Sequence, residues 1–275
     1  MNHMLLILSA TLLSTHPVAS FSVTSLSFHM RNSCSRLNGI SKPQDAKGVI
    51  FDIDGTLANS WKLGFDATQV VLKNRHIPLI TEELYHECTR YSTPDRLARH
   101  AGYLPDDSGF DEMGKILAAE FDELYVGLVD KSTAGFYPGI DELILDLPSD
   151  GKERIKIAAL TNACVAYAHA VLKTNCDGRD LYSRFLSIHG ADTVPQPKPN
   201  PDGLLICCQE IDISPDRCVY IGDSPTDGLA AKAAGMMAIG CSWGSHSEDS
   251  LRRNGSFDYI CCSVSELRDL LPQHE

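Results

Sequence analysis

Short apolar runs alternate with amphipathic segments over most of this chain. We expect buried strands at residues 46–52, 155–160, 185–188, 218–222 and 236–241, with a weaker run at 258–261. Between them, residues 163–174, 200–210 and 226–234 carry apolar residues at the spacing of one helix face. Strands that alternate with helices predict an α/β fold, specifically a Rossmann-like, doubly wound parallel sheet.

Residues 61–137 interrupt this alternation, because they contain several helical patterns and no convincing strand. The clearest pattern lies between residues 109 and 130, where apolar residues recur at helical spacing: Phe110, Met113, Ile116, Leu117, Phe121, Leu124 and Leu128. We therefore predict an inserted α-helical cap domain at 61–137. Residues 44–60 and 138–275 then form the Rossmann-like core.

Local signals mark the ends of two further helices. Thr93 and Pro94 match an N-cap followed by a first-turn proline, and Gly102 matches the end of that helix. Ser263 and Glu266 have the spacing of a capping box that opens a final helix.

The first 43 residues have a composition of their own. They contain no acidic residue, a short apolar run from Met4 to Leu13, and a Ser-rich, basic stretch after Phe21. A signal-like run followed by a transit-like segment resembles the bipartite presequences of algae with complex plastids. We therefore expect a signal/transit presequence at residues 1–43 and a plastid location, with secretion or mitochondrial import as the alternatives.

Charge and cysteine usage exclude several classes of partner. All 36 acidic residues but only 21 of the 24 basic residues lie in residues 44–275, so this part has a net charge of −15. Such an acidic body predicts no nucleic-acid binding. No apolar run is long enough to cross a bilayer, so no membrane association is expected in the mature form. The ten cysteines show neither C-x-x-C nor zinc spacing, which favours buried, reduced thiols.

Four short polar motifs follow expected strands. They are Asp52-Ile53-Asp54-Gly55-Thr56, Thr161-Asn162, Lys198-Pro199 and Gly222-Asp223-Ser224-Pro225-Thr226-Asp227. Because the carboxyl ends of parallel strands lie at one edge of a sheet, these motifs are expected to meet in one pocket.

Their chemistry suits phosphoryl transfer. Asp52 can attack phosphorus, and Asp54 can act as acid and then as base. The carboxylates would repel a phosphate dianion by roughly 1–4 kcal/mol per charge pair at about 4 Å, a conflict that a hard cation such as Mg²⁺ removes. Lys198 adds positive charge and the Thr161 hydroxyl adds a donor.

An ordinary structural interpretation exists for one part of this set. Asp223 and Asp227 could simply form a turn and a helix N-cap, and each of the shorter motifs means little alone. Their occurrence together with the first motif, in this order, favours the catalytic interpretation.

The ordered motifs D-x-D-G-T, T-N, K-P and G-D-x-x-x-D resemble those of the haloacid dehalogenase superfamily, and the insert after the first motif is similar to its C1-capped branch. Gly135-Phe136-Tyr137-Pro138-Gly139 and Ser242-Trp243-Gly244 resemble phosphoglycolate phosphatases within that branch. The resemblance covers about residues 47–272.

This resemblance implies a role for each motif. Asp52 would form an aspartyl-phosphate, and Asp54 would be the acid/base and lend its backbone carbonyl to Mg²⁺. The phosphate would be bound by Thr161-Asn162 and Lys198. The metal site would comprise Asp52, Asp54, Asp223 and Asp227. Asp54 also argues against dehalogenation, since the dehalogenases of the superfamily lack this second aspartate.

The substrate must be recognised by the insert, because the core motifs hold only a phosphoryl group. Arg96 could meet a carboxylate or second anionic group, or it could belong to a solvated basic helix face. We expect a small-molecule phosphate ester as substrate, with 2-phosphoglycolate the first candidate. The alternatives are a phosphomutase of the β-phosphoglucomutase kind, a phosphatase of another sugar or cofactor phosphate, and a non-catalytic binding protein.

Overall fold

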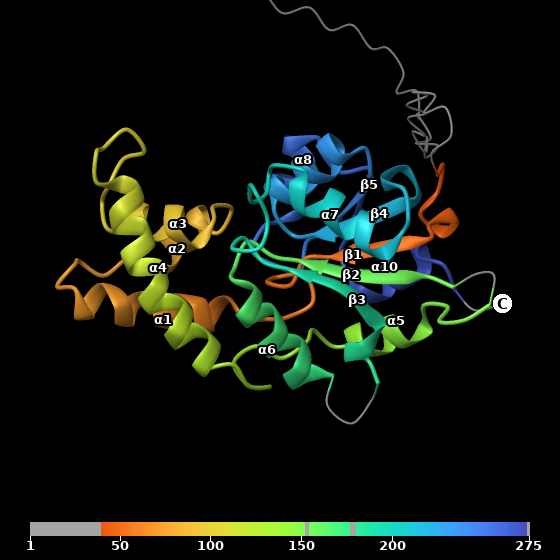
Figure 1. Cartoon of the computed structure of the whole chain (residues 1–275), viewed down its shortest axis with the longest axis horizontal. Helices are drawn as coiled ribbons and strands as arrows, with labels where there is room; N and C mark the ends of the chain where they lie inside the picture. Colours follow the sequence, from red (N-terminus) through yellow and green to blue (C-terminus); the bar gives the residue numbers. More distant parts are fainter. Residues whose placement is uncertain (1–39, 152–153, 177–179, 274–275) are drawn as a thin grey trace, which may run out of the picture. The chain divides into compact units, whose positions relative to one another are not determined.

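A computed structural model describes residues 40–151, 154–176 and 180–273. Its centre is a six-stranded, wholly parallel sheet with the strand order β3-β2-β1-β4-β5-β6 (Figure 1). The strands are β1 (Gly48–Phe51), β2 (Lys156–Leu160), β3 (Phe185–His189), β4 (Cys218–Gly222), β5 (Met237–Cys241) and β6 (Tyr259–Cys261). The predicted doubly wound α/β fold is confirmed, and each strand lies where an apolar run predicted it.

Helices cover both faces of the sheet (Figure 1). The core helices are α5 (Ile140–Asp146), α6 (Val165–Asn175), α7 (Asp202–Ile211), α8 (Pro225–Ala234), α9 (Glu248–Asn254) and α10 (Val264–Leu270). Residues of α5, α6 and α10 pack in one apolar cluster with one face of the sheet, whereas α7 and α8 pack on the other face. Three short 3-10 turns complete the core: η1 (Pro43–Asp45), η2 (Tyr182–Arg184) and η3 (Pro215–Arg217).

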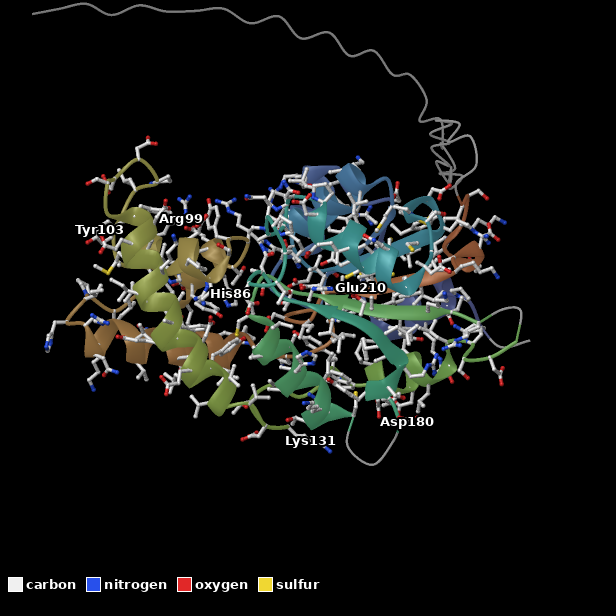
Figure 2. The ribbon with its side chains drawn as sticks, in the orientation of Figure 1. His86, Arg99, Tyr103, Lys131, Asp180 and Glu210 are labelled. Atoms are coloured by element: carbon white, nitrogen blue, oxygen red, sulfur yellow. The ribbon has the colours of Figure 1, made fainter. Side chains whose placement is uncertain are left out.

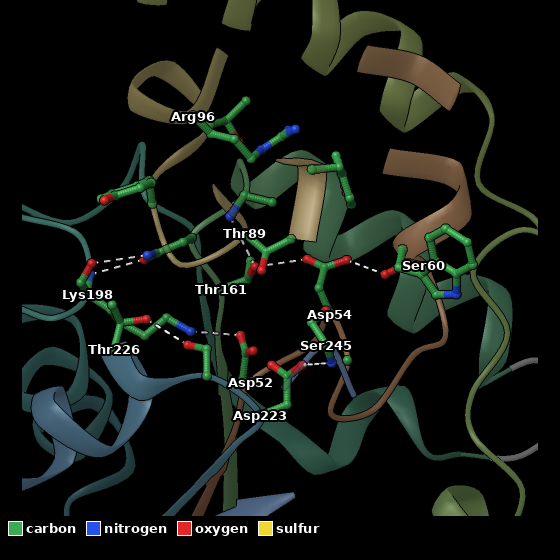
Figure 3. Close-up of a pocket in the computed structure, with 18 of the residues that line it drawn as sticks. Asp52, Asp54, Ser60, Thr89, Arg96, Thr161, Lys198, Asp223, Thr226 and Ser245 are labelled. Atoms are coloured by element: carbon green, nitrogen blue, oxygen red, sulfur yellow. Dashed lines mark hydrogen bonds and ion pairs between the residues drawn. The ribbon is translucent and has the colours of Figure 1, made fainter. Parts of the chain in front are cut away.

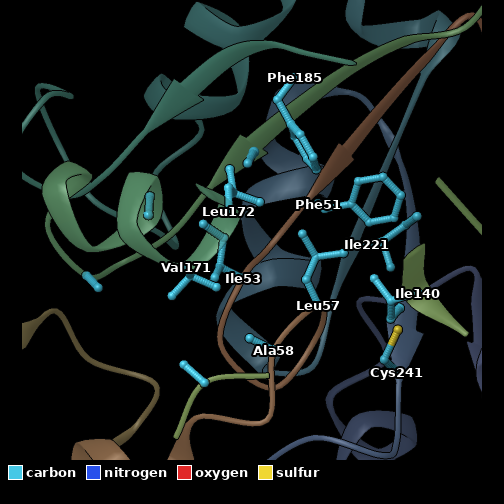
Figure 4. Close-up of a cluster of buried hydrophobic side chains, with 14 of the residues drawn as sticks. Phe51, Ile53, Leu57, Ala58, Ile140, Val171, Leu172, Phe185, Ile221 and Cys241 are labelled. Atoms are coloured by element: carbon cyan, nitrogen blue, oxygen red, sulfur yellow. The ribbon is translucent and has the colours of Figure 1, made fainter. Parts of the chain in front are cut away.

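The larger apolar cluster supports the loop that carries the first motif (Figure 4). Phe51 at the end of β1, and Ile53 and Leu57 just beyond it, are completely buried. They belong to the same cluster as Ile140 of α5 and Leu172 of α6. Each such side chain contributes about 1.5–3 kcal/mol to the free energy of unfolding when fully buried. This packing therefore fixes the backbone of the first motif.

Between β1 and β2 the chain forms an all-helical insert of four helices: α1 (Trp61–Asn74), α2 (Glu82–Cys88), α3 (Thr93–His100) and α4 (Phe110–Gly127). Figure 2 shows the side chains of this part of the chain, including Arg99 on α3. The two connections to the core lie side by side, because Asn59 N–H donates to the Gly135 carbonyl at 2.8 Å and Tyr137 N–H donates to the Leu57 carbonyl at 2.9 Å. The helical nature of the insert matches the prediction, and its division from the core at residues 61 and 137 stays a prediction.

Two details of the helix ends differ from the sequence-based expectation. Thr93 is wrong as an N-cap, since it is already the first residue of α3 and Ser92 precedes it in an extended conformation. The final capping box is half formed. Ser263 accepts the N–H of Glu266 at 3.2 Å, but Glu266 reaches past Ser263 to the N–H of Cys262.

The described chain is attached to the core from its first residue, since Ile40 N–H donates to the Asp216 carbonyl at 2.9 Å. The predicted presequence falls, for residues 1–39, outside the described residues. All nine cysteines in the described ranges are free, and seven of them are buried, as expected. Among the described residues, no helix combines the length and apolar character needed to cross a bilayer.

Candidate active site

A cavity of about 80 Å³ lies at the carboxyl edge of the sheet, between the core and the insert (Figure 3). Seven of the eight residues predicted for the site line it: Asp52, Asp54, Arg96, Thr161, Asn162, Lys198 and Asp223. The eighth, Asp227, is completely buried behind Lys198. The parallel sheet therefore brings the four motifs together as expected.

Glycines allow the loop after β1 to approach the loop after β4. Gly55 has a φ of +75°, and a Cβ there would lie 2.0 Å from Asp223 Oδ2. A Cβ on Gly244 would lie 2.2 Å from the same oxygen. Trp243 Nε1 donates to the Thr56 carbonyl at 3.1 Å and fastens this turn. Any larger residue at either glycine would displace Asp223 from the cavity.

Lys198 is the central cation of the site. Its Nζ lies 2.8 Å from Asp52 Oδ1 and 2.7 Å from Asp227 Oδ1, and it also donates to the Tyr220 hydroxyl at 2.9 Å. Burial lowers the pKa of Lys198, but the carboxylates of Asp227 and Asp52 together outweigh burial and raise that pKa above its ordinary value. The ammonium group therefore stays charged and holds Asp52 in place.

Asp227 is fully occupied by protein donors. Its Oδ2 accepts both the N–H and the hydroxyl of Ser224 at 2.9 Å, which closes a capping box at the start of α8. Its Oδ1 accepts Lys198 and, at 3.1 Å, the hydroxyl of Tyr220. The helix-cap interpretation is thus right for Asp227, with Ser224 as the N-cap, and Asp227 also anchors Lys198.

The buried carboxylates fit a divalent cation. Oxygens of Asp52, Asp223 and Asp227 lie within 4.8 Å of one another. Burial raises the pKa of Asp52 well above its usual range, with Asp227 and Asp223 adding to the rise and Lys198 opposing it. Burial and Asp227 likewise raise the pKa of Asp223 to about 7.

One ammonium group among three carboxylates leaves negative charge uncompensated, which a hard cation with oxygen ligands would neutralise. Asp227 has no free oxygen, whereas Asp223 Oδ2 accepts only the N–H of Ser245, at 2.6 Å. Asp52 and Asp223 are therefore the side chains best placed to hold Mg²⁺. The side chain of Asp54 lies outside this group of carboxylates.

The carboxylate of Asp54 is surrounded by hydroxyl groups. Its Oδ1 accepts Tyr167 at 2.6 Å and Tyr125 at 2.9 Å, as well as Ser60, and its Oδ2 accepts Thr161 at 3.3 Å. Burial, followed by the nearby Asp54 carboxylate, raises the pKa of both phenols well above the usual value, so they stay protonated and donate. Ser60, Tyr125 and Tyr167 could not be predicted as site residues from the sequence, because a serine before a helix usually caps it and tyrosines on helix faces usually belong to a core.

Thr161 and Asn162 have different environments. The Thr161 hydroxyl lines the cavity beside Asp54. Asn162 uses both ends of its carboxamide on the Lys198 backbone: Nδ2 donates to the carbonyl at 3.1 Å, and Oδ1 accepts the N–H at 3.0 Å. The Asn162 side chain thus orients the loop that carries Lys198, and a direct contact of Asn162 with phosphate stays a prediction.

Arg96 is only 6% exposed, so the interpretation as a solvated surface charge is wrong. Its Nη1 donates to the Thr68 hydroxyl at 2.9 Å, and its guanidinium lies 4.7 Å from the ring centre of Phe121 and 5.2 Å from that of Tyr85. No carboxylate of the described residues forms an ion pair with it. Burying a cation without an anionic partner costs folding free energy. Because Arg96 lines the cavity, a bound anion could supply the missing partner.

The family model described as haloacid dehalogenase-like hydrolase matches residues 49–241. The chain belongs to this family. Among curated proteins it is similar to the phosphoglycolate phosphatase of Escherichia coli O157:H7, with 28% identity over 85% of this chain and 94% of the relative. It is also similar to the phosphoglycolate phosphatase of Salmonella typhi, with 26% identity over 74% of this chain and 84% of that protein.

Solved structures of other proteins share the fold of this hydrolase. CbbY of Rhodobacter sphaeroides, solved in complex with xylulose-1,5-bisphosphate, aligns with a TM-score of 0.64 and 24% identity over 81% of this chain and 96% of CbbY. A hydrolase from Pseudomonas syringae aligns with a TM-score of 0.63 and 24% identity over 81% of this chain and 98% of that protein. Each alignment covers most of this chain, so the overall fold is shared with both structures.

Proposed function

We propose that this phosphatase hydrolyses 2-phosphoglycolate, with Mg²⁺ as cofactor and an aspartyl-phosphate on Asp52 as intermediate. The proposed substrate rests on one observation, the position of Arg96. This buried cation lines the cavity from the insert side and has no carboxylate partner among the described residues. Figure 3 shows Arg96 across the cavity from Asp52 and Asp223. A substrate with phosphate at one end and carboxylate at the other would pair both ends. The names of the bacterial relatives support the same substrate.

In the first step the Asp52 carboxylate attacks phosphorus, and an O–P bond forms as the bond from phosphorus to the glycolate oxygen breaks. Lys198 neutralises charge on the phosphoryl oxygens, the Thr161 hydroxyl donates a hydrogen bond to one of them, and Asp54 gives its proton to the departing glycolate oxygen. Asp52 and Asp223 would hold Mg²⁺, which would supply the additional positive charge that lets a phosphate approach these carboxylates.

In the second step Asp54, now ionised, takes a proton from a water molecule that attacks the phosphorus of the aspartyl-phosphate. The O–P bond to Asp52 breaks, inorganic phosphate leaves, and both aspartates return to their starting states. The same side chain thus serves as acid and base, because it faces the leaving oxygen and the attacking water in turn.

The size of the cavity supports a small substrate. About 80 Å³ corresponds to roughly five to eight water-sized groups. A two-carbon phosphate is close to this size, whereas a hexose phosphate is nearly twice as large. The volume supports the smaller substrate, and the product formed from a hexose phosphate decides between hydrolysis and the phosphomutase alternative.

A substrate panel tests this function. Phosphoglycolate, ethyl phosphate and glucose 1-phosphate are compared by kcat/KM, because ethyl phosphate has a similar length but no carboxylate. A site that pairs the carboxylate should reject ethyl phosphate by about a hundredfold or more. A preference for ethyl phosphate or for a sugar phosphate would overturn the substrate assignment. Formation of glucose 6-phosphate from glucose 1-phosphate would identify a mutase.

A further inference from the structure

Two tyrosines from different parts of the chain meet on the acid/base residue. Tyr125 belongs to α4 of the insert and Tyr167 to α6 of the core. Their rings are stacked, with centres 4.0 Å apart and an angle of 16° between the planes. Both hydroxyls donate to Asp54 Oδ1, at 2.9 Å and 2.6 Å. Neither ring is more than 4% exposed.

We propose that Tyr125 and Tyr167 are positioning residues that orient the Asp54 carboxyl group for proton transfer, and that Tyr125 makes this orientation depend on the placement of the insert. The proposal rests on the proposed function only in taking Asp54 as the acid/base.

The distribution of donors distinguishes the two oxygens of Asp54. Oδ1 accepts three hydroxyls, from Ser60, Tyr125 and Tyr167, which fills the positions around that oxygen. Oδ2 accepts only the Thr161 hydroxyl, at 3.3 Å. Oδ2 is therefore the oxygen left to exchange a proton with the substrate. Without the tyrosines the carboxyl group could rotate, and small errors of alignment at a reacting group are expensive.

Tyr125 links this orientation to the insert. The carboxylates of Asp52, Asp223 and Asp227 are held by core residues, namely Lys198, Tyr220, Ser224 and Ser245. Within the described chain, Tyr125 is the residue of α1–α4 that hydrogen-bonds a catalytic carboxylate. Displacing the insert would remove this donor, and Asp54 would keep only the hydroxyls of Ser60, Thr161 and Tyr167. The acid/base is thus fully oriented only when the insert covers the site.

Removing the hydroxyls while keeping the rings tests the proposal. The variants are Tyr125→Phe, Tyr167→Phe and the double variant. Tyr182→Phe is the control, because its hydroxyl bonds His169 Nδ1 at 2.8 Å outside the cavity. For each protein, kcat/KM is measured on phosphoglycolate and on acetyl phosphate, a small mixed anhydride whose acetate leaves without protonation. For both substrates kcat/KM reports the steps from binding through formation of the aspartyl-phosphate, so it does not include hydrolysis of that intermediate.

The ratio of the two kcat/KM values should fall about tenfold or more in the double variant and less in each single variant, since general acid catalysis contributes about 10²–10⁴-fold. It should be unchanged in Tyr182→Phe. Parallel losses on both substrates, or an unchanged ratio in a folded double variant, would overturn the positioning role. If circular dichroism shows that the double variant is unfolded, the ratio of the two kcat/KM values in Tyr125→Phe alone tests the positioning role.

Asp54→Asn separates this proposal from the proposed function. If Asp54→Asn lowers the ratio and the tyrosine variants do not, only the positioning role fails. If Asp54→Asn leaves the ratio unchanged, Asp54 is not the acid and the mechanism itself fails. Should the wild type not turn over phosphoglycolate, ethyl phosphate takes its place, so the test of the tyrosines does not depend on the carboxylate.

Discussion

Replacing Arg96 with glutamine should damage the hydrolysis of phosphoglycolate selectively. Arg96 is buried in the cavity wall, has no carboxylate partner in the described chain, and is held in place by Thr68 and by the rings of Phe121 and Tyr85. Glutamine keeps a polar side chain but removes the charge. The Thr68 hydroxyl remains satisfied, because it also donates to the Gly64 carbonyl at 2.7 Å.

The expected magnitude follows from the bond that would be lost. A hydrogen bond to a charged group contributes about 1.5–3 kcal/mol, and about 1.4 kcal/mol corresponds to a factor of ten. We therefore expect Arg96→Gln to lower kcat/KM on phosphoglycolate by about ten- to a hundredfold. Arg96→Lys keeps the charge but not the planar fork, so its loss should be smaller.

The assay compares phosphoglycolate with acetyl phosphate, which has no carboxylate to lose. Arg99→Gln is the matched control. Arg99 lies on the same helix (Figure 2). Its guanidinium lies 3.9 Å from the ring centre of Tyr91, and the residue does not line the cavity. Melting temperatures show whether each variant is folded. Equal losses on the two substrates, or no loss on either, would refute the role of Arg96 in binding the substrate carboxylate.

Three further predictions concern the metal, the lysine anchor and the presequence. Chelation should abolish activity and Mg²⁺ restore it. Because burial and Asp227 raise the pKa of Asp223 to about 7, the metal-free folded state binds this proton more tightly than the unfolded state. Metal-free stability should therefore fall as the pH rises from about 4, the usual pKa of an aspartate in the unfolded chain, through about 7. Mg²⁺ should raise Tm more at about pH 8 than at about pH 5, and equal shifts would contradict this. Asp227→Asn should cost about 3–5 kcal/mol in urea unfolding because it breaks a buried ion pair, whereas Asp223→Asn should remove the response to Mg²⁺ with little loss of stability; equal destabilisation would disprove the distinction. Mass spectrometry of protein from its native source should show that residues 1–43 are largely removed, and an intact Met1 would refute the targeting hypothesis.

The sheet and the position of the four polar motifs could be predicted from the sequence. Asp52, Thr161 and Asp223 directly follow buried strands, and a parallel arrangement brings such positions to one edge whatever their separation along the chain. The apolar runs are distinctive because β1 and β4 are buried on both faces.

The insert side of the site could not be predicted, since helical periodicity identifies an apolar face but not what that face covers. Tyr125 lies next to the apolar stripe of α4, and nothing local shows that its hydroxyl meets Asp54, which is 71 residues away along the chain. The same reason explains Arg96, whose burial depends on Tyr85 and Phe121 from two other helices. The anchoring of Lys198 by Asp227 likewise requires the loops after β3 and β4 to be placed together.

The covalent intermediate is the central claim, and it can be observed directly. Asp54→Asn is mixed with acetyl phosphate and Mg²⁺, quenched with acid, digested and analysed by mass spectrometry. Acetate needs no proton to leave, so Asp52 should still be phosphorylated, while the missing base should slow hydrolysis and let the adduct accumulate. We expect one phosphoryl group on the peptide that contains Asp52. The double variant, which carries Asp52→Asn together with Asp54→Asn, should show none. Acetate release without such an adduct, or an adduct on any other residue, would contradict the mechanism.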